Sequence, residues 1–363
     1  MAYTPHVALL ATGDEIKNGD ILNTNSQVIA ERLFSQGILP GSHIIVGDNI
    51  DEIKTAIQFL LKSHQALIIT GGLGPTSDDI TRDALASALD KKLVFDETSW
   101  EFIIQRLKNF GYDTPPASNK RQAFFPEGST IIPNPNGTAA GCSVDVNNQW
   151  IFMLPGPPPE CLPMFHDVVM PLLIKQGFQK TFYHQKWLLF GVSEGEVAET
   201  LDAIAKPYDC TTGYRICYPY IECKIYSNNK NDFLNIVAKI NDAVTDYIID
   251  DGKLTASEKL KQLLPTLSFN IRICDQATGG MLESTILTPE TYHKLSFTSD
   301  RTKADVTITG LKEFWNHEQS NNTTLEITTQ NQTFSKKIPL RGIRAKLYAL
   351  EWVSKFILNH VIR

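Results

Sequence analysis

Short apolar runs alternate with amphipathic segments through the first ninety residues, and this alternation is the feature that most restricts the fold. The apolar runs are predicted to be buried strands at residues 6–11, 42–46 and 66–70. The amphipathic segments are predicted to be helices at residues 25–37, 53–61 and 81–89. Because strands joined through helices run parallel, the pattern predicts a doubly wound α/β domain with a parallel sheet.

The rest of the 363-residue chain predicts further modules after this domain. The first domain continues through a helix at 98–110, strands at 130–132, 142–146 and 150–154, and a helix that ends near residue 175. Residues 180–251 have the pattern of a small α+β unit with strands at 187–190 and 221–226 and helices at 194–205 and 233–249. Beyond residue 256 we expect a helix, strands near 269–274, 306–309 and 325–338, and a closing helix at 341–362. The predicted domains are 1–175, 176–253 and 254–363.

The net charge and the hydropathy of the chain restrict the classes of partner that it can bind. The 34 Lys and Arg residues against 40 Asp and Glu residues give a net charge of −6, without a basic block for nucleic-acid phosphates. No run approaches 18 apolar residues, and the apolar run near the N-terminus is too short for a signal peptide. We therefore expect a cytoplasmic protein that binds a small molecule and neither nucleic acid nor membrane.

Polar residues follow the first predicted strand. Asp14 and Glu15 come directly after it, and Asn23 and Asn25 follow a few residues later. Ligands bind at this edge of an open parallel sheet, so the carboxylates are candidate metal ligands and the two asparagines candidate ligand-binding residues. The alternative is a capped turn in which Asn25 or Ser26 is the helix N-cap.

A glycine-rich segment after the third strand is the strongest functional signal. Residues 70–81 read Thr-Gly-Gly-Leu-Gly-Pro-Thr-Ser-Asp-Asp-Ile-Thr. Glycines let backbone amides approach a phosphate, and adjacent carboxylates can bind a metal ion that bridges phosphate oxygens. The segment lacks the Gly-Lys-Ser/Thr of a Walker loop and the spacing of a dinucleotide fingerprint. The candidate residues are Gly71, Gly72, Gly74 and Thr76 for phosphate, with Asp78 and Asp79 for metal.

Two further loops have the composition of a pocket wall for a base or a pterin. The first contains Asn136, Gly137 and Thr138, and the second contains Pro155 and Gly156 and places Glu160 at a helix start. Each loop alone is also consistent with an ordinary turn.

These segments together resemble the N-terminal domain of the CinA family. The shared strings are Thr-Gly-Asp-Glu-Ile-x-x-Gly, Asn-Thr-Asn, Val-Gly-Asp, Gly-Gly-Leu-Gly-Pro-Thr-x-Asp-Asp, Phe-Pro-Glu-Gly, Gly-Thr-Ala and Leu-Pro-Gly-x-Pro, in order over about 170 residues. One departure is Ala140, where the family usually has proline. The segment 190–198 is similar to the family's connecting domain.

The resemblance implies a molybdopterin-binding fold and metal-dependent hydrolysis of ADP-ribose or related pyrophosphates. It places the important aspartates at Asp48 and Asp79, and it suggests a homodimer. Our hypothesis is that the amides of residues 71–76 bind the pyrophosphate while Asp14, Asp48, Asp78 and Asp79 surround one or two divalent ions, Mg, Mn or Co. The alternatives are a molybdopterin- or nucleotide-binding regulatory protein and a molybdenum-cofactor adenylyltransferase.

The last segment resembles a nicotinamide-nucleotide amidohydrolase domain that has lost its nucleophile. The family signature is Glu-Ser-Cys-Thr-Gly-Gly, whereas residues 275–280 read Asp-Gln-Ala-Thr-Gly-Gly, so Gln276 occupies the serine position. A glutamine amide has no oxygen that a base can activate as a nucleophile. We predict that this domain has no amidase activity.

Overall fold

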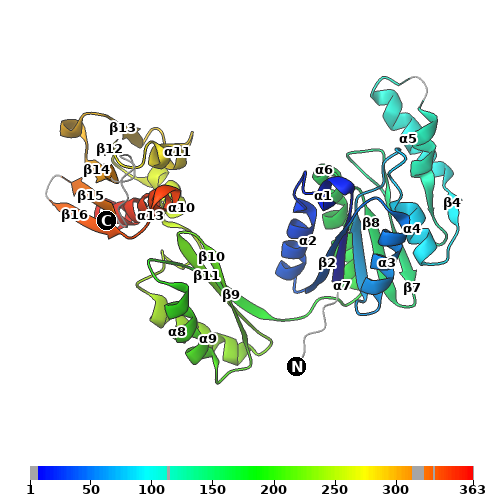
Figure 1. Ribbon diagram of the computed structural model, residues 1–363, viewed down its shortest axis with the longest axis horizontal. Coiled ribbons are helices and arrows are strands. Elements are labelled where there is room, and N and C mark those ends of the chain that lie inside the picture. The colour runs from blue at the N-terminus through cyan, green and yellow to red at the C-terminus, as the bar shows by residue number, and fades with distance from the viewer. Residues whose placement is uncertain (1–6, 113–114, 313–322, 330–331, 363) are drawn as a thin grey trace. The chain divides into compact units, whose positions relative to one another are not determined.

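The computed structural model describes residues 7–112, 115–312, 323–329 and 332–362. The chain divides into two compact units, Met1–Thr181 and Phe182–Arg363 (Figure 1). His6, which we expected in the first strand, lies outside the described residues. Among the residues described, none of the helices has the length and apolar content needed to cross a membrane.

A six-stranded sheet forms the centre of the first unit. Its strand order is β2-β1-β3-β8-β7-β6, and all its strands except β7 run in the same direction. The strands are β1 (Val7–Thr12), β2 (Pro40–Val46), β3 (Ala66–Thr70), β6 (Thr130–Ile132), β7 (Gly141–Val146) and β8 (Gln149–Leu154). The predicted α/β class is confirmed, and the sheet is mixed rather than wholly parallel.

The reversed strand arises from a tight hairpin between β7 and β8. Asn147 and Asn148 occupy the two turn positions with φ of 52° and 63°. Asparagine tolerates this left-handed conformation, and two such residues form the turn that matches the twist of paired antiparallel strands. A two-residue connection cannot join parallel strands, so this turn fixes the direction of β7.

Helices cover both faces of the sheet, as a doubly wound fold requires (Figure 1). Alternate residues of each strand supply two cores: Leu9 packs with one face and Leu10 with the other. The first core includes α2 (Thr24–Ser35), α6 (Pro158–Met164), a π-helical turn (Phe165–Val169) and α7 (Met170–Lys175). The second includes α3 (Ile50–Leu61) and α4 (Thr81–Ala88). A short helix, α1 (Asp14–Lys17), follows β1.

A smaller group of elements has a hydrophobic cluster of its own. It contains α5 (Glu97–Asn109), a 3-10 segment (Ala117–Ala123) and the pair β4 (Leu93–Phe95) and β5 (Phe124–Pro126). Ile103, Leu107 and Ala123 form its buried centre. The sequence predicted α5 but not the two strands, which are three residues long and too short for a period-two pattern.

The second unit begins with a three-stranded antiparallel sheet of order β10-β11-β9. Its elements are β9 (Tyr183–Phe190), α8 (Glu194–Ala205), β10 (Thr211–Cys217), β11 (Tyr220–Ser227) and α9 (Lys230–Val244). A capping box between Ser193 and Glu196 begins α8 at the predicted residue. Strand β10 was missed because most of its residues are partly or fully exposed.

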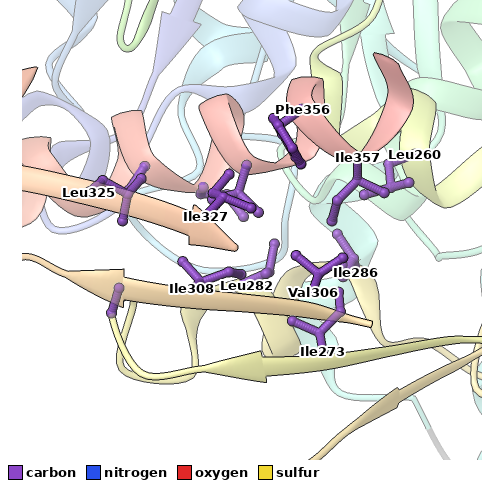
Figure 2. Close-up of a cluster of buried hydrophobic side chains, with 14 of the residues drawn as sticks. Leu260, Ile273, Leu282, Ile286, Val306, Ile308, Leu325, Ile327, Phe356 and Ile357 are labelled. Atoms are coloured by element: carbon purple, nitrogen blue, oxygen red, sulfur yellow. The ribbon is translucent and has the colours of Figure 1, made fainter. Parts of the chain in front are cut away.

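A five-stranded sheet of order β13-β12-β14-β15-β16 forms the rest of the second unit. Its elements are α10 (Ala256–Leu263), β12 (Ile271–Asp275), α11 (Met281–Ile286), β13 (Leu295–Phe297), β14 (Val306–Gly310), β15 (Thr323–Thr329), β16 (Thr333–Ile338) and α13 (Gly342–His360). Figure 2 shows Phe356 and Ile357 of α13 facing strand residues such as Ile327 and Val306. The division of this unit into 176–253 and 254–363 stays a prediction.

Candidate functional site

The carboxyl ends of neighbouring strands bring the predicted site residues together. Strands β2, β1, β3 and β8 are adjacent and parallel, so the segments after Val46, Thr12, Thr70 and Leu154 emerge at one edge of the sheet. Strand β6 has the same direction, which places the segment after Ile132 at this edge too. Open α/β sheets bind ligands at such an edge.

Asp14 and Asp48 form a reciprocal pair at this edge. The Asp14 amide donates to Oδ2 of Asp48 at 3.0 Å, and the Asp48 amide donates to Oδ1 of Asp14 at 3.3 Å. Gly47 makes the approach possible, because a Cβ at this position would lie 2.2 Å from Oδ1 of Asp14. The two aspartates, 34 residues apart in sequence, therefore belong to one site.

The environment of Asp48 disfavours its ionised form. Burial raises the pKa of Asp48, and the negative charges of Asp14, Glu15 and Asp78 raise it further, while the Asp14 amide acts in the opposite direction. Three carboxylates thus lie within electrostatic reach of Asp48. A cation, or a proton on Asp48, would relieve this repulsion.

The glycine-rich loop, residues 71–79, joins β3 to the turn before α4, and its glycines permit close contacts. A Cβ at Gly71 would lie 2.3 Å from the Thr12 carbonyl oxygen, and one at Gly72 would lie 2.1 Å from Oγ1 of Thr81. Both residues have positive φ, 107° and 63°. At Gly74, a Cβ would lie 2.3 Å from Oδ2 of Asp79. These glycines therefore hold the loop in a conformation that larger residues cannot adopt.

Two aspartates of this loop have different surroundings. Oδ2 of Asp79 accepts from the Thr76 amide at 2.9 Å and from the Thr76 hydroxyl at 2.5 Å, which closes the loop on itself. Asp78 is exposed, and hydrogen bonding with Thr76 and a backbone amide lowers its pKa. Asp78 is therefore ionised at neutral pH, and one oxygen of Asp79 is already engaged by the protein.

The two asparagines after β1 have different hydrogen-bonding roles. Asn23 is the N-cap of α2, since its Oδ1 accepts from the Ser26 amide at 3.1 Å. The alternative of a capped turn is therefore confirmed, but its cap is Asn23 and not Asn25 or Ser26. Asn25 is buried, and its Nδ2 donates to the Gly156 carbonyl at 2.6 Å. Oδ1 of Asn25 is buried without a hydrogen-bond partner in the described part of the chain. A buried acceptor without a donor is costly and is one feature of a binding site.

The two further loops contact each other through Glu160. Oε2 of Glu160 accepts from Nδ2 of Asn134 at 2.6 Å, and Oδ1 of Asn134 accepts from the Asn136 and Gly137 amides, both at 2.9 Å. A Cβ at Gly137 would lie 2.1 Å from Oε2 of Glu160. Half-buried Thr138 lies in the first loop and buried Pro155 in the second. These contacts give Glu160 and Gly137 a structural role, and their role in ligand binding stays a prediction.

A pocket of about 400 Å³ lies beside Asn134. Phe102, Ile131, Pro133 and Ala140 supply its apolar wall, with Asp96 and Ser99 among its polar residues. Its volume and mixed lining are typical of pockets for small ligands. The pocket belongs to the same edge of the sheet, because Asn134 follows β6.

The carboxylates at this edge fit a divalent ion in part. Within the described ranges, the structure contains no group of three or more His, Cys, Asp or Glu side chains placed to hold a metal. These residues therefore do not form a site that holds an ion by protein side chains alone. Mg²⁺, however, commonly binds through one or two carboxylates together with water and substrate phosphates, and Asp14 and Asp48 provide that number.

In the second unit, the polar side chains of the loop at 275–280 are bonded to other groups of the protein. The Asp275 carboxylate accepts from the Ala277 and Thr278 amides at 3.0 and 2.9 Å and also from the Thr278 hydroxyl. Oε1 of Gln276 accepts from Nε of Arg301 at 2.9 Å and from the neighbouring Nη2. The side chain at the position that the resemblance assigns to the serine is thus bonded to a cation.

Sequence reasoning missed several residues of the first site. Gly47 lies in a quoted string, but its close approach to Asp14 depends on the pairing of β1 with β2. Asn134 holds two loop amides, and Arg82 is buried against the glycine-rich loop. Arg82 stands between the polar residues Thr81 and Asp83, so the local sequence did not mark it as buried.

Comparisons with known proteins agree with this architecture. Residues 8–175 match the family model described as "Probable molybdopterin binding domain". A competence-damage inducible protein of Thermoanaerobacter pseudethanolicus is 34% identical over 284 residues, which cover 77% of this chain and 68% of the relative. A CinA-like protein of Dictyoglomus thermophilum is 33% identical over 291 residues, covering 77% of this chain and 69% of that protein.

Two solved structures each match about half of this chain. A CinA protein of unknown function from Thermoplasma acidophilum is 28% identical, with a TM-score of 0.44, over 47% of this chain and 98% of that one. The molybdopterin biosynthesis enzyme MoaB of Thermus thermophilus is 18% identical, with a TM-score of 0.33, over 47% of this chain and 93% of that one. From the sequence relatives, which extend into the second unit, we conclude that the chain belongs to the CinA-like, competence-damage-inducible protein family, with a domain of the molybdopterin-binding type in its first half.

Proposed function

We propose that the first unit is a metal-dependent nucleotide pyrophosphatase that acts on ADP-ribose or a related nucleotide diphosphate. The observation that carries the proposal is the placement of a glycine-rich loop beside the paired carboxylates of Asp14 and Asp48 at one edge of the sheet. Amides can bind the phosphate oxygens there, and the carboxylates can share a cation with them.

The roles of individual residues follow from their surroundings. The amides of Gly72, Leu73 and Gly74 bind the pyrophosphate, and Asp14 and Asp48 face its bridging region. Of the other residues up to Thr76, Pro75 has no N–H, and the Gly71 and Thr76 amides donate to the Leu154 carbonyl and to Asp79. A divalent ion, when bound, would neutralise phosphate charge and acidify a water molecule. Asp48 is the best candidate for the base, because its raised pKa makes it the stronger proton acceptor.

In this reaction water oxygen attacks one phosphorus atom as its proton passes to Asp48. The bond between that phosphorus and the bridging oxygen breaks, and the products are AMP and ribose 5-phosphate. The pocket beside Asn134 is the candidate site for the adenine ring of the substrate. Phe102, Ile131 and Pro133 give it apolar walls for a flat ring. Its position three strands from β3 lets a single extended ligand reach both the loop and the pocket.

The direct test measures AMP formation from ADP-ribose with Mg²⁺, Mn²⁺ or Co²⁺. We expect metal-dependent turnover that falls by about 10²-fold or more in Asp48→Asn, because a proton acceptor and a metal ligand are both removed. Asp51→Asn makes the same change of charge three residues away, in the exposed first turn of α3, and should retain activity. No turnover with any of the three metals would refute the pyrophosphatase proposal.

A binding protein without turnover is the second candidate. It is favoured by the lack of a three-ligand metal site among the described side chains and by the engagement of Asp79 with Thr76. The ligand would then stabilise the protein without being converted; at 100 times Kd the expected gain is about 2.7 kcal/mol. A rise in Tm with ADP-ribose, without product, would support this candidate.

A further inference from the structure

Arg82 is a buried cation that contacts the glycine-rich loop. It lies in α4 and is 3% exposed, and burial lowers its pKa to about 10, so it keeps its charge at neutral pH. Asp79 and Asp83 attract it and Arg121 repels it, yet no carboxylate in the described part of the chain lies within ion-pair distance of it. Its Nε is buried and lacks a hydrogen-bond partner among the described residues.

An unpaired buried charge lowers stability, because the protein interior solvates it poorly. A small cavity of about 100 Å³ is lined by Arg82 together with Asp79, Asp83 and Arg121. Arg82 therefore has a charge that no ion pair within the described ranges neutralises, next to the loop that is proposed to bind an anion.

The same side chain fixes the direction of the loop's peptide groups. Nη2 of Arg82 donates to the Leu73 carbonyl at 2.6 Å, and Nε2 of Gln122 donates to the same oxygen at 3.3 Å. Nη1 of Arg121 donates to the Thr76 carbonyl at 3.1 Å. In a planar trans peptide, the C=O and the following N–H point in opposite directions. Holding the Leu73 carbonyl therefore directs the Gly74 amide away from Arg82.

We propose that Arg82 is a positioning residue for the anion of the substrate: it orients the Gly74 amide through Leu73 and supplies a buried positive charge close to the bound pyrophosphate. This inference rests on the proposed function, in which the loop amides bind that group. The ligand class it requires is a pyrophosphate or another closely spaced pair of phosphates. Arginine suits this role because it stays charged when buried and donates in a fixed fork.

The test is the affinity of the full-length protein for inorganic pyrophosphate, measured by calorimetric titration at two ionic strengths. Arg82→Met removes the charge and the donor with little change in volume, and Arg82→Lys keeps the charge with a single donor group. Gln122→Met is the matched comparison, since it removes a donor to the same carbonyl without changing the charge. The Tm of each variant shows whether it is folded.

We expect Kd for pyrophosphate to rise about tenfold or more in Arg82→Met and to rise less in Arg82→Lys. Gln122→Met should change Kd by less than about threefold. The dependence of Kd on salt should weaken only in the Met variant of Arg82, because that variant alone loses the cation. Loss of loop shape alone would not produce this difference in salt dependence.

Two results would overturn the inference while leaving the proposed function intact. One is a folded Arg82→Met protein that binds pyrophosphate as tightly as the parent. The other is a Gln122→Met protein that is weakened as much as Arg82→Met, which would make loop shape sufficient. If the parent itself does not bind pyrophosphate, both the inference and the proposed function fail.

Discussion

The two units each contain a glycine-bearing loop that is closed by an aspartate and a threonine, and in the first unit a carboxylate of this loop lies near that of Asp48. In the first unit Asp79 accepts from the amide and hydroxyl of Thr76, and in the second Asp275 accepts from the same groups of Thr278. Both loops follow a parallel strand of a sheet. Local closure is therefore common to both and cannot by itself define a site.

The surroundings of the two loops differ. The loop at 71–79 has Asp14 and Asp48 in the segments that follow β1 and β2 at the same edge of the sheet, and buried Arg82 against its backbone. At 275–280, Gln276 is bonded to Arg301, and Asp275 is bonded within its own loop. Side chains from segments that follow other strands, and not the loop motif, therefore give the first unit its potential chemistry.

The largest expected difference is in turnover. Asp79→Ala should reduce ADP-ribose hydrolysis by between about 10² and 10³, because it removes a carboxylate next to the phosphates and opens the loop. Asp275→Ala, the matched change in the second unit, should leave the rate unchanged. Product separation after incubation with metal measures both. Equal rates in Asp79→Ala and the parent would show that this carboxylate has no part in the reaction.

The next difference is in stability. Gly72→Ala forces a Cβ to within 2.1 Å of Oγ1 of Thr81 at a φ of 63°, whereas a Cβ at Gly280, with φ of 82°, meets no atom within 4 Å. We expect losses of about 3 kcal/mol at Gly72 and about 1 kcal/mol at Gly280, the latter from backbone strain alone. Hydrogen exchange followed by mass spectrometry assigns each loss to its unit. Equal losses at the two positions would contradict the packing difference.

A smaller effect concerns pH. Because the pKa of Asp48 is raised in the folded state, the free energy of unfolding contains a contribution from this group that is complete below its unfolded pKa and declines as pH rises through the folded pKa. Asp48→Asn should therefore have a slightly higher Tm than the parent at pH 7, by an amount that solvent screening keeps small. The difference should vanish near pH 3. A variant less stable than the parent at pH 7 would mean that the Asp14 amide contact outweighs the repulsion.

The smallest expected effect is that of placing a serine at position 276, which should not produce amidase activity. Gln276→Ser returns a hydroxyl to the position that the amidohydrolase resemblance assigns to the nucleophile. The side chain bonded to Gln276 is that of Arg301, a cation that cannot accept a proton, so we expect neither the parent nor the variant to convert nicotinamide mononucleotide to its acid. Release of ammonia in a coupled assay is the measurement. Activity in the parent would contradict the prediction of a catalytically inactive domain, and activity only in the variant would mean that the rest of the site is intact.

The sequence by itself determined the elements whose signals are local. Strand β3 and helix α8 have the predicted bounds, since an apolar run between polar residues and a capping box are both set by neighbours in sequence. The glycine-rich loop was found for the same reason. The resemblance to the CinA family, read from strings spread over the first half, is confirmed by the relatives.

Only the tertiary structure decided which distant residues share a site. Three contacts join residues that are 34, 26 and 9 positions apart in the sequence. They are the hydrogen bonds between Asp14 and Asp48, between Asn134 and Glu160, and between Arg82 and Leu73. The direction of β7 and the short strands β4 and β5 likewise depend on pairing partners rather than on their own composition. Local propensity determines where the chain turns, whereas contacts across the sheet determine which residues lie beside each turn. The chemistry of the site depends on these neighbouring residues.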